Sequence, residues 1–121
     1  MTSKVLIADD DPEILETLSI LLKGDGFSVI KAENGLEAVQ LAKKHLPALI
    51  MLDIHMPKMD GLTACKTIKS DPMTKNIPVV MLTVEGNIKE IEQAISYGAK
   101  TYITKPAGRG DIEKVVKTLI R

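Results

Sequence analysis

The sequence predicts an α/β fold in which five parallel strands form one sheet and five helices cover both of its faces. Two observations support this prediction. Five short apolar runs alternate strictly with five longer segments whose apolar residues recur at positions i, i+3, i+4 and i+7. Three of the short runs, VLIA, ALIML and VVML, are almost continuously apolar, which is typical of strands buried on both faces of a parallel sheet.

The expected strands are the short apolar runs, and glycines mark several of the joints between elements. In chain order the strands are Val5–Ala8, Phe27–Lys31, Ala48–Leu52, Val79–Leu82 and Thr101–Thr104. Connections between successive parallel strands are expected to be right-handed.

The expected helices each carry one apolar stripe. Asp11 and Pro12 begin the first helix as its N-cap and first helical residue. The stripes are Ile14, Leu15, Leu18, Leu21 and Leu22 in Pro12–Lys23; Val39 and Ala42 in Leu36–His45, continued by Leu46; Ala64, Cys65 and Ile68 in Leu62–Ser70; Ile88, Ile91, Ala94 and Ile95 in Ile88–Tyr97; and Ile112, Val115, Val116 and Leu119 in Asp111–Ile120.

Length and composition narrow the possible functions. A domain usually has roughly 100–200 residues, so we expect the 121 residues, 1–121, to form a single domain. Sixteen basic residues balance sixteen acidic ones, which argues against direct nucleic-acid binding and against a polybasic membrane-surface protein. The single cysteine, Cys65, suits a reducing compartment. The chain shows neither a signal peptide nor an apolar run of the ~18 residues that span a bilayer, so we expect a cytoplasmic location.

Polar side chains gather where the expected strands end. The residues in question are Asp9, Asp10 and Asp11 after the first strand, Asp53 after the third, Thr83 after the fourth, and Lys105 and Pro106 after the fifth. Because functional groups of such sheets lie beyond the carboxyl ends of the strands, we expect these side chains to meet at one edge.

Carboxylates packed together repel one another, and a divalent cation relieves that repulsion. Oxygen ligands suit Mg²⁺ or Mn²⁺, and Mg²⁺ keeps positions for phosphate oxygens. Lys105 and Thr83 offer an ammonium and a hydroxyl to the same oxygens. Since a carboxylate can be a nucleophile, the edge predicts metal-assisted phosphoryl transfer with an aspartate as acceptor.

Each of these residues also has an ordinary structural explanation when it is considered alone. Asp11 is better explained as an N-cap than as a ligand. Asp9 and Asp10 are explained as solvated loop acids, and Lys105 as a surface lysine. The combination at the ends of four strands is what favours a functional site.

Four segments carry a resemblance to a known family: VLIADDDP, MLDIHMPKMDG, VVMLT and YITKPA. The chain resembles, from Lys4 to Leu119, the receiver domain of two-component response regulators, and the run from Asp53 to Gly61 is very specific. CheY, a member of this family, is flavodoxin-like. The resemblance therefore implies a doubly wound sheet with strand order 2-1-3-4-5, which the alternation alone leaves open.

The resemblance also implies roles for individual residues. Asp53 would accept a phosphoryl group from a sensor histidine kinase or phosphotransfer protein. Asp10 would be a direct acidic ligand of Mg²⁺, and Asp9 one that acts mainly through water. The third ligand would be the backbone carbonyl of His55. Mn²⁺ would be able to replace Mg²⁺.

Three further roles follow from the same resemblance. Thr83 would be the switch hydroxyl that reaches the phosphoryl group, and Lys105 would pair with a phosphoryl oxygen. Tyr102 would be the aromatic residue whose rotamer follows that hydroxyl, and the Lys105–Pro106 peptide bond would be cis. The chain would then be a signalling switch that catalyses its own aspartyl phosphorylation and dephosphorylation, rather than a turnover enzyme.

The sequence departs from the family pattern in places. Val84 stands where a small residue is usual, and we hypothesise that it forms a partial lid over Asp53; the competing interpretation packs it into the core. Ala107 replaces a large apolar residue, and residues 108–110 predict a loose start to the last helix. His55 and Glu85 occupy variable positions that flank the path of hydrolytic water.

Other functions stay open at this point. A flavodoxin-type binder would need a phosphate-binding loop where Asp9, Asp10 and Asp11 stand. A phosphatase with an aspartyl intermediate commonly has a second aspartate at the position of His55. A degenerate receiver would act only as an interaction module. The output partner, a possible fused effector domain and the cognate kinase are not specified by the sequence.

Overall fold

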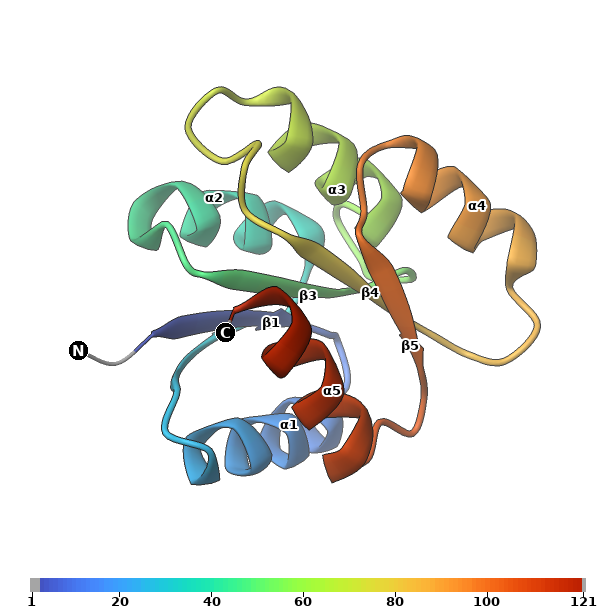
Figure 1. Cartoon of the computed structure of the whole chain (residues 1–121). Coiled ribbons are helices and arrows are strands. Elements are labelled where there is room, and N and C mark those ends of the chain that lie inside the picture. Colours follow the sequence, from blue (N-terminus) through green and yellow to red (C-terminus); the bar gives the residue numbers. More distant parts are fainter. Residues whose placement is uncertain (1–2, 121) are drawn as a thin grey trace.

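The computed structural model describes residues 3–120, and within them five strands alternate with five helices (Figure 1). The strands are β1 (Lys4–Ala8), β2 (Ser28–Ala32), β3 (Leu49–Asp53), β4 (Val79–Thr83) and β5 (Thr101–Thr104). The helices are α1 (Pro12–Gly24), α2 (Gly35–His45), α3 (Gly61–Ser70), α4 (Ile88–Ser96) and α5 (Arg109–Leu119). The sheet is parallel with order β2-β1-β3-β4-β5, which confirms the predicted fold and strand order.

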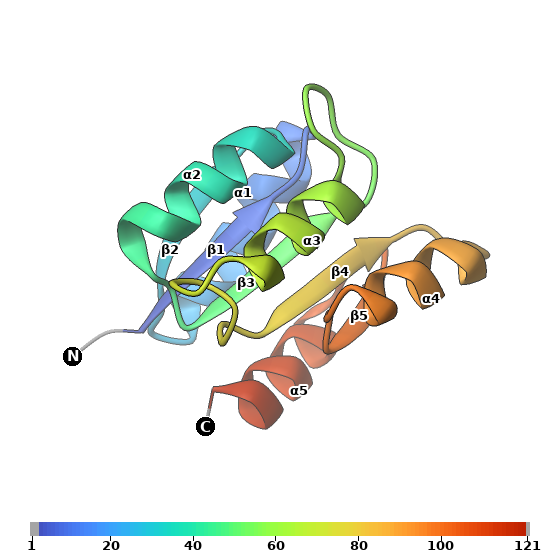
Figure 2. The same cartoon turned by 90° about the horizontal axis from the view of Figure 1, so that it is seen from above.

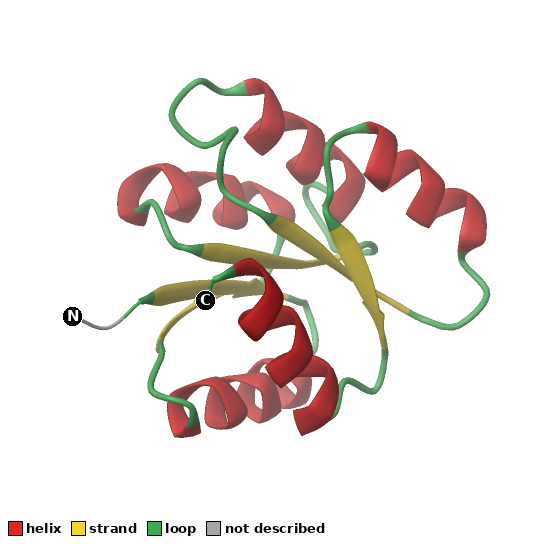
Figure 3. Cartoon of the chain, viewed as in Figure 1, coloured by secondary structure: helices red, strands yellow, loops and turns green. Residues whose placement is uncertain are grey.

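The sheet lies between two layers of helices. Helices α1 and α5 cover one face, and α2, α3 and α4 cover the other (Figure 1). The view from above shows the helices running alongside the strands (Figure 2), and colouring by secondary structure separates the central sheet from its two helical layers (Figure 3). None of the helices described is long and apolar enough to cross a membrane.

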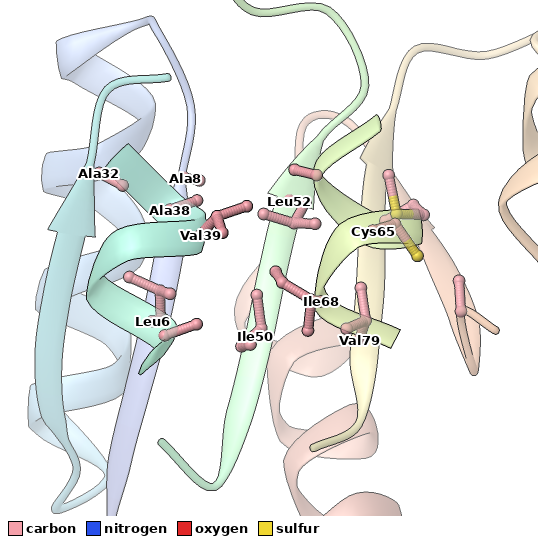
Figure 4. Close-up of a cluster of buried hydrophobic side chains, with 14 of the residues drawn as sticks. Leu6, Ala8, Ala32, Ala38, Val39, Ile50, Leu52, Cys65, Ile68 and Val79 are labelled. Atoms are coloured by element: carbon pink, nitrogen blue, oxygen red, sulfur yellow. The ribbon is translucent and has the colours of Figure 1, made fainter. Parts of the chain in front are cut away.

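Each central strand contributes side chains to the hydrophobic core on both faces of the sheet, because successive side chains of a strand point to opposite faces. Leu6 and Ile50 belong to the core under α2 and α3, whereas Ile7 and Met51 belong to the core under α1 and α5. Figure 4 shows the first of these cores, with Leu6, Ile50 and Ile68 among its labelled side chains. Burial of one such side chain contributes about 1.5–3 kcal/mol, so these two cores dominate the stability of the fold.

Three helices begin with a side-chain cap. The Asp11 carboxylate accepts a hydrogen bond from the Glu13 amide at 2.9 Å, which confirms the predicted N-cap of α1. Asn34 and Asp60 cap α2 and α3 in the same way. Helix α4 differs, because its N-cap residue, Asn87, makes no side-chain capping bond.

Several expected boundaries are wrong by one or two residues, and two of these shifts matter for the site. Asp53 and Thr83 were expected just after their strands, but each is the last residue of its strand. The reason is that the parallel ladder continues to the site, since Asp53 pairs with Leu82 and Thr83 pairs with Thr104. Both site residues are therefore held by the sheet rather than by a loop.

The expected loose start of α5 is also wrong. The helix begins at Arg109 rather than at Asp111. The Gly108 amide donates a hydrogen bond to the Asp111 carboxylate at 3.1 Å, and this contact orders the first turn. Two glycines thus do not prevent the turn from forming, because the acidic side chain satisfies a backbone donor that would otherwise lack a partner within the helix.

The β3–α3 loop, residues 54–60, is held closely by backbone contacts at both ends. The Gly61 amide donates to Ile54 O at 2.7 Å, and the Gly35 amide donates to Met59 O at 2.9 Å. A Cβ on Gly61 would lie 1.9 Å from Asp53 O, and one on Gly35 would lie 2.2 Å from Met59 O. These two positions therefore require glycine, because only glycine lets the backbones approach so closely.

Candidate functional site

Three carboxylates meet at the carboxyl edge of the sheet. Asp9 and Asp10 follow β1, and Asp53 ends the neighbouring strand β3. One oxygen of each carboxylate lies within 4.8 Å of the others, with Asp9 and Asp53 buried and Asp10 exposed. The structure thus brings together the three acids that the sequence singles out, with one of them open to solvent.

Lys105 lies between two of these acids. Its Nζ is 2.8 Å from Asp9 Oδ2 and 2.9 Å from Asp53 Oδ1. Asp9 Oδ2 is fully buried, and its approach to the lysine is an ion pair without hydrogen-bond geometry. Lys105 is thus the charged partner of this oxygen, while the three clustered carboxylates together still favour a further cation.

Burial raises the pKa of Asp53 above its ordinary value of 3.8. Lys105 opposes this rise, while the charges of Asp9 and Asp10 add to it. For Lys105 itself, burial acts to lower the pKa, but the Asp9 and Asp53 carboxylates outweigh it and the pKa is raised. One lysine therefore does not compensate for three acids, and the donor set fits a divalent cation whose ligands are hard oxygens.

Thr83 ends β4 next to β3 and is buried. Its hydroxyl donates a hydrogen bond to the carbonyl of the following residue, Val84, at 3.2 Å. This is a long bond for a hydroxyl donor, so the group can exchange it for a better acceptor at little cost. The hydroxyl is thus available to an oxygen that arrives beside Asp53.

Two residues near Thr83, Val84 and Tyr102, are exposed. Val84 is 55% exposed, which shows that the interpretation placing it in the core is wrong. Tyr102 on β5 is also exposed, and no hydrogen bond joins it to Thr83 within residues 3–120. The peptide bond between Lys105 and Pro106 is cis, the geometry that the resemblance implies.

Ala107 opens a cavity beside Lys105. The cavity has a volume of about 330 Å³, and its apolar lining includes Ile14, Leu18 and Leu82. Ala107 itself is partly buried against the core under α1 and α5. The small side chain therefore leaves a space where a larger apolar residue was expected, without exposing the core broadly.

Sequence reasoning did not identify one contact at this edge. His55 Nε2 lies 3.1 Å from Glu90 Oε1, and the pair joins the β3–α3 loop to the first turn of α4. The two residues are 35 positions apart, and Glu90 is one of several acidic residues on an amphipathic helix. No local pattern distinguishes Glu90, so only the tertiary structure could reveal it.

A flavodoxin-like domain with a carboxylate and lysine cluster at the carboxyl edge of its sheet is the class of protein that the fold and the site define. Residues 5–117 match the family described as "Response regulator receiver domain". The chain belongs to this family, and it is a receiver domain of two-component response regulators.

The chain is similar to known members of this family. It is 41% identical over 118 residues to the DNA-binding dual master transcriptional regulator RpaA of Synechocystis, an alignment that covers 98% of this chain and 49% of the relative. The chain thus spans about half the length of the curated relatives it matches.

Two crystal structures resemble the fold closely. The signal receiver domain of a signal transduction histidine kinase from Syntrophus aciditrophicus has a TM-score of 0.89 and 33% identity, covering 98% of this chain and 90% of that one. The chemotaxis protein CheY4 of Vibrio cholerae has a TM-score of 0.92 and 28% identity, covering 99% of this chain and 100% of that one.

Proposed function

We propose that Asp53 accepts a phosphoryl group from a phosphohistidine of a sensor histidine kinase or a phosphotransfer protein. The observation that carries the proposal is the position of the Asp53 carboxylate. It is buried at the end of β3, beside a second buried acid and within 2.9 Å of the Lys105 ammonium. A fixed carboxylate next to a cationic group is arranged both to attack phosphorus and to have its product stabilised.

In the transfer step an oxygen of Asp53 forms a bond to phosphorus, and the bond between phosphorus and the donor's imidazole nitrogen breaks. The electron pair of the broken bond stays on that nitrogen. Lys105 then pairs with a phosphoryl oxygen in addition to Asp9, and Thr83 turns its hydroxyl from the Val84 carbonyl to a second phosphoryl oxygen. The modification adds about −1.5 to −2 charge at neutral pH and so biases the surrounding loops.

The same residues hold a cation in this proposal. Asp10 and Asp53 would bind Mg²⁺, Asp9 would act mainly through water, and the His55 carbonyl would complete the protein ligands. Mn²⁺ would serve as a substitute. When bound, the cation neutralises charge between Asp53 and the incoming phosphoryl group. The three carboxylates, each with an oxygen within 4.8 Å of the others, support this assignment.

The signal ends by hydrolysis in the same site. Water attacks phosphorus, the bond to Asp53 breaks, and the carboxylate and inorganic phosphate are released. Self-catalysed phosphorylation and dephosphorylation of this kind make a switch rather than a turnover enzyme. The exposed side chains of His55, Val84 and Glu85, which follow Asp53 and Thr83 closely in the sequence, would set how long the phosphoryl group lasts.

The proposal extends to the setting of the domain. Residues 1–121 would form a single receiver domain in the cytoplasm, where the buried free thiol of Cys65 stays reduced. The balanced charge supports a domain that does not itself bind nucleic acid. Its output would pass to a partner or to an effector domain of a longer protein, as the DNA-binding activity named for RpaA illustrates.

Intact-mass measurement with acetyl phosphate tests the function. We expect one phosphoryl adduct that requires Mg²⁺ or Mn²⁺, because the acids otherwise repel an incoming anion. The adduct should disappear in Asp53→Asn and persist in Asp71→Asn, which changes an acid outside the site. An adduct that survives in Asp53→Asn would overturn the assignment of the acceptor.

A further inference from the structure

Backbone hydrogen bonds hold the β3–α3 loop on several sides, among them those from Gly35 to Met59 and from Ile54 to Leu82 of β4. A side-chain pair between His55 and Glu90, with Nε2 and Oε1 3.1 Å apart, connects the loop to α4. This pair attaches at the residue whose carbonyl belongs to the proposed cation site.

The partners in this pair differ in their surroundings. The His55 side chain is 69% exposed, while that of Glu90 is 30% exposed. The carboxylate of Glu90 is an acceptor, so the pair forms a hydrogen bond in the tautomer of His55 whose Nε2 is the donor. The glutamate is therefore the better fixed partner, and it restrains a side chain that would otherwise move freely in solvent.

Helix α4 itself is lightly attached. Ala94 is its one buried residue, and Asn87 provides no side-chain cap for its first turn. Within the described chain, the His55–Glu90 pair is the side-chain hydrogen bond that ties this turn to the loop after Asp53. This contact therefore links the position of the loop to the start of α4.

We infer that Glu90 is a positioning residue that holds the β3–α3 loop, through His55, in the conformation that binds the cation. The inference rests on the proposed function. A loop that is already fixed loses less conformational freedom on binding, and so the cation binds more tightly. Glu90 makes no hydrogen bond to Asp53 or to an atom proposed to bind the cation, and it acts through the His55 side chain.

The coupling operates in both directions. If the His55–Glu90 pair strengthens cation binding, cation binding strengthens the pair by the same factor. The first turn of α4 then becomes more ordered when Mg²⁺ binds, before any phosphoryl group arrives. The cation site and a helix on the surface are thus linked by one hydrogen bond.

Titration of the whole chain with Mg²⁺ alone tests this inference. We expect Glu90→Ala to weaken Mg²⁺ binding by about two- to fivefold, the effect of losing one exposed pair. Glu90→Gln should keep the wild-type affinity, because its amide oxygen still accepts from His55. Glu92→Ala is the matched control, since it removes the same charge from an exposed position of the same helix.

The variants distinguish a positioning role of Glu90 from a direct attraction between its negative charge and the cation. If the negative charge of Glu90 attracted the cation directly, Glu90→Gln would bind as weakly as Glu90→Ala, and the inference would be wrong. In a His55→Ala background, Glu90→Ala should have no further effect. Backbone NMR supplies a second measurement, because amide shifts in the first turn of α4 should follow Mg²⁺ in the wild type and in Glu90→Gln but not in Glu90→Ala.

Failure of the inference differs from failure of the function. Equal Mg²⁺ affinities in wild type and Glu90→Ala, with wild type still binding, would overturn the inference and leave the acceptor site intact. Absence of Mg²⁺ binding in the wild type would overturn both.

Discussion

The two loops that flank Asp53 are built in opposite ways. The β3–α3 loop is fixed to its surroundings by backbone hydrogen bonds at Gly61 and Gly35, where no side chain fits. The β4–α4 segment, residues 84–87, carries an exposed valine and ends in an N-cap without a side-chain bond. A Cβ on Gly86 would meet nothing within 4 Å.

This difference places a tightly held loop and a more exposed segment on the two sides of the site. Asp53 and the backbone carbonyl of His55 lie beside the tightly held loop, where the proposed chemistry needs fixed geometry. Thr83 is held by the sheet, but the segment that follows it is exposed and has fewer contacts to constrain it.

Glycine substitutions test this contrast most strongly. Gly61→Ala should lower the free energy of unfolding by about 3 kcal/mol or more, because the new Cβ meets backbone atoms of Asp53 that cannot move aside. Gly86→Ala should cost only about 1–2 kcal/mol, the penalty for a positive φ, which is 96° at this position. Urea unfolding of both variants measures the difference. Equal losses would show that the two loops are equally constrained.

Mg²⁺ should stabilise the fold through the carboxylates of Asp9, Asp10 and Asp53. At a hundredfold excess over its dissociation constant, a ligand that binds only the folded state adds about 2.7 kcal/mol to the free energy of unfolding. We expect this gain in the wild type and its loss in Asp9→Asn, because that variant removes a buried carboxylate oxygen from the site. Thermal unfolding with and without Mg²⁺ gives the comparison. A full gain in Asp9→Asn would remove Asp9 from the site.

Removal of the Asp53 charge should stabilise the metal-free protein by a smaller amount. The pKa of Asp53 is raised in the folded state, mainly by burial, so folding disfavours the ionised form. Asp53→Asn should therefore unfold less readily at neutral pH. The advantage is full above the folded pKa of Asp53 and should vanish as the pH falls below the unfolded value of 3.8. Chemical unfolding across this range would contradict the expectation if the variant were less stable at neutral pH.

Val84 should affect rates with little effect on stability. Its side chain is exposed and β-branched, so it has few rotamers with which to leave the approach to Asp53. We expect Val84→Ala to speed both phosphorylation by acetyl phosphate and loss of the phosphoryl group. Its free energy of unfolding should change by no more than about 0.5 kcal/mol. Unchanged rates would refute the hypothesis that Val84 is a lid.

Most of the fold could be predicted from the sequence, because its signals are local. Alternating apolar runs predict the layers, and Asp11 predicts the start of α1. The strand ends could not be predicted, since Asp53 and Thr83 are polar residues that a cross-strand ladder keeps in the sheet.

Within the site, the acids and Lys105 could be predicted because they follow strands whose carboxyl ends must meet. Their ion pairs could not, because the position of the lysine between Asp9 and Asp53 depends on three separate strands. The Glu90 contact lacks any local signal and depends on how α4 packs.

Because the thiol of Cys65 is buried, the domain can be labelled selectively with a spectroscopic probe at a cysteine introduced elsewhere. Burial raises the pKa of this thiol to about 11, with the charge of Lys69 only partly opposing the effect. At neutral pH the group is therefore an inaccessible thiol rather than a reactive thiolate, and alkylating dyes should not react with it. A cysteine introduced at the exposed position of Glu92 would then be the one reactive thiol, in a chain that has no tryptophan to report on α4.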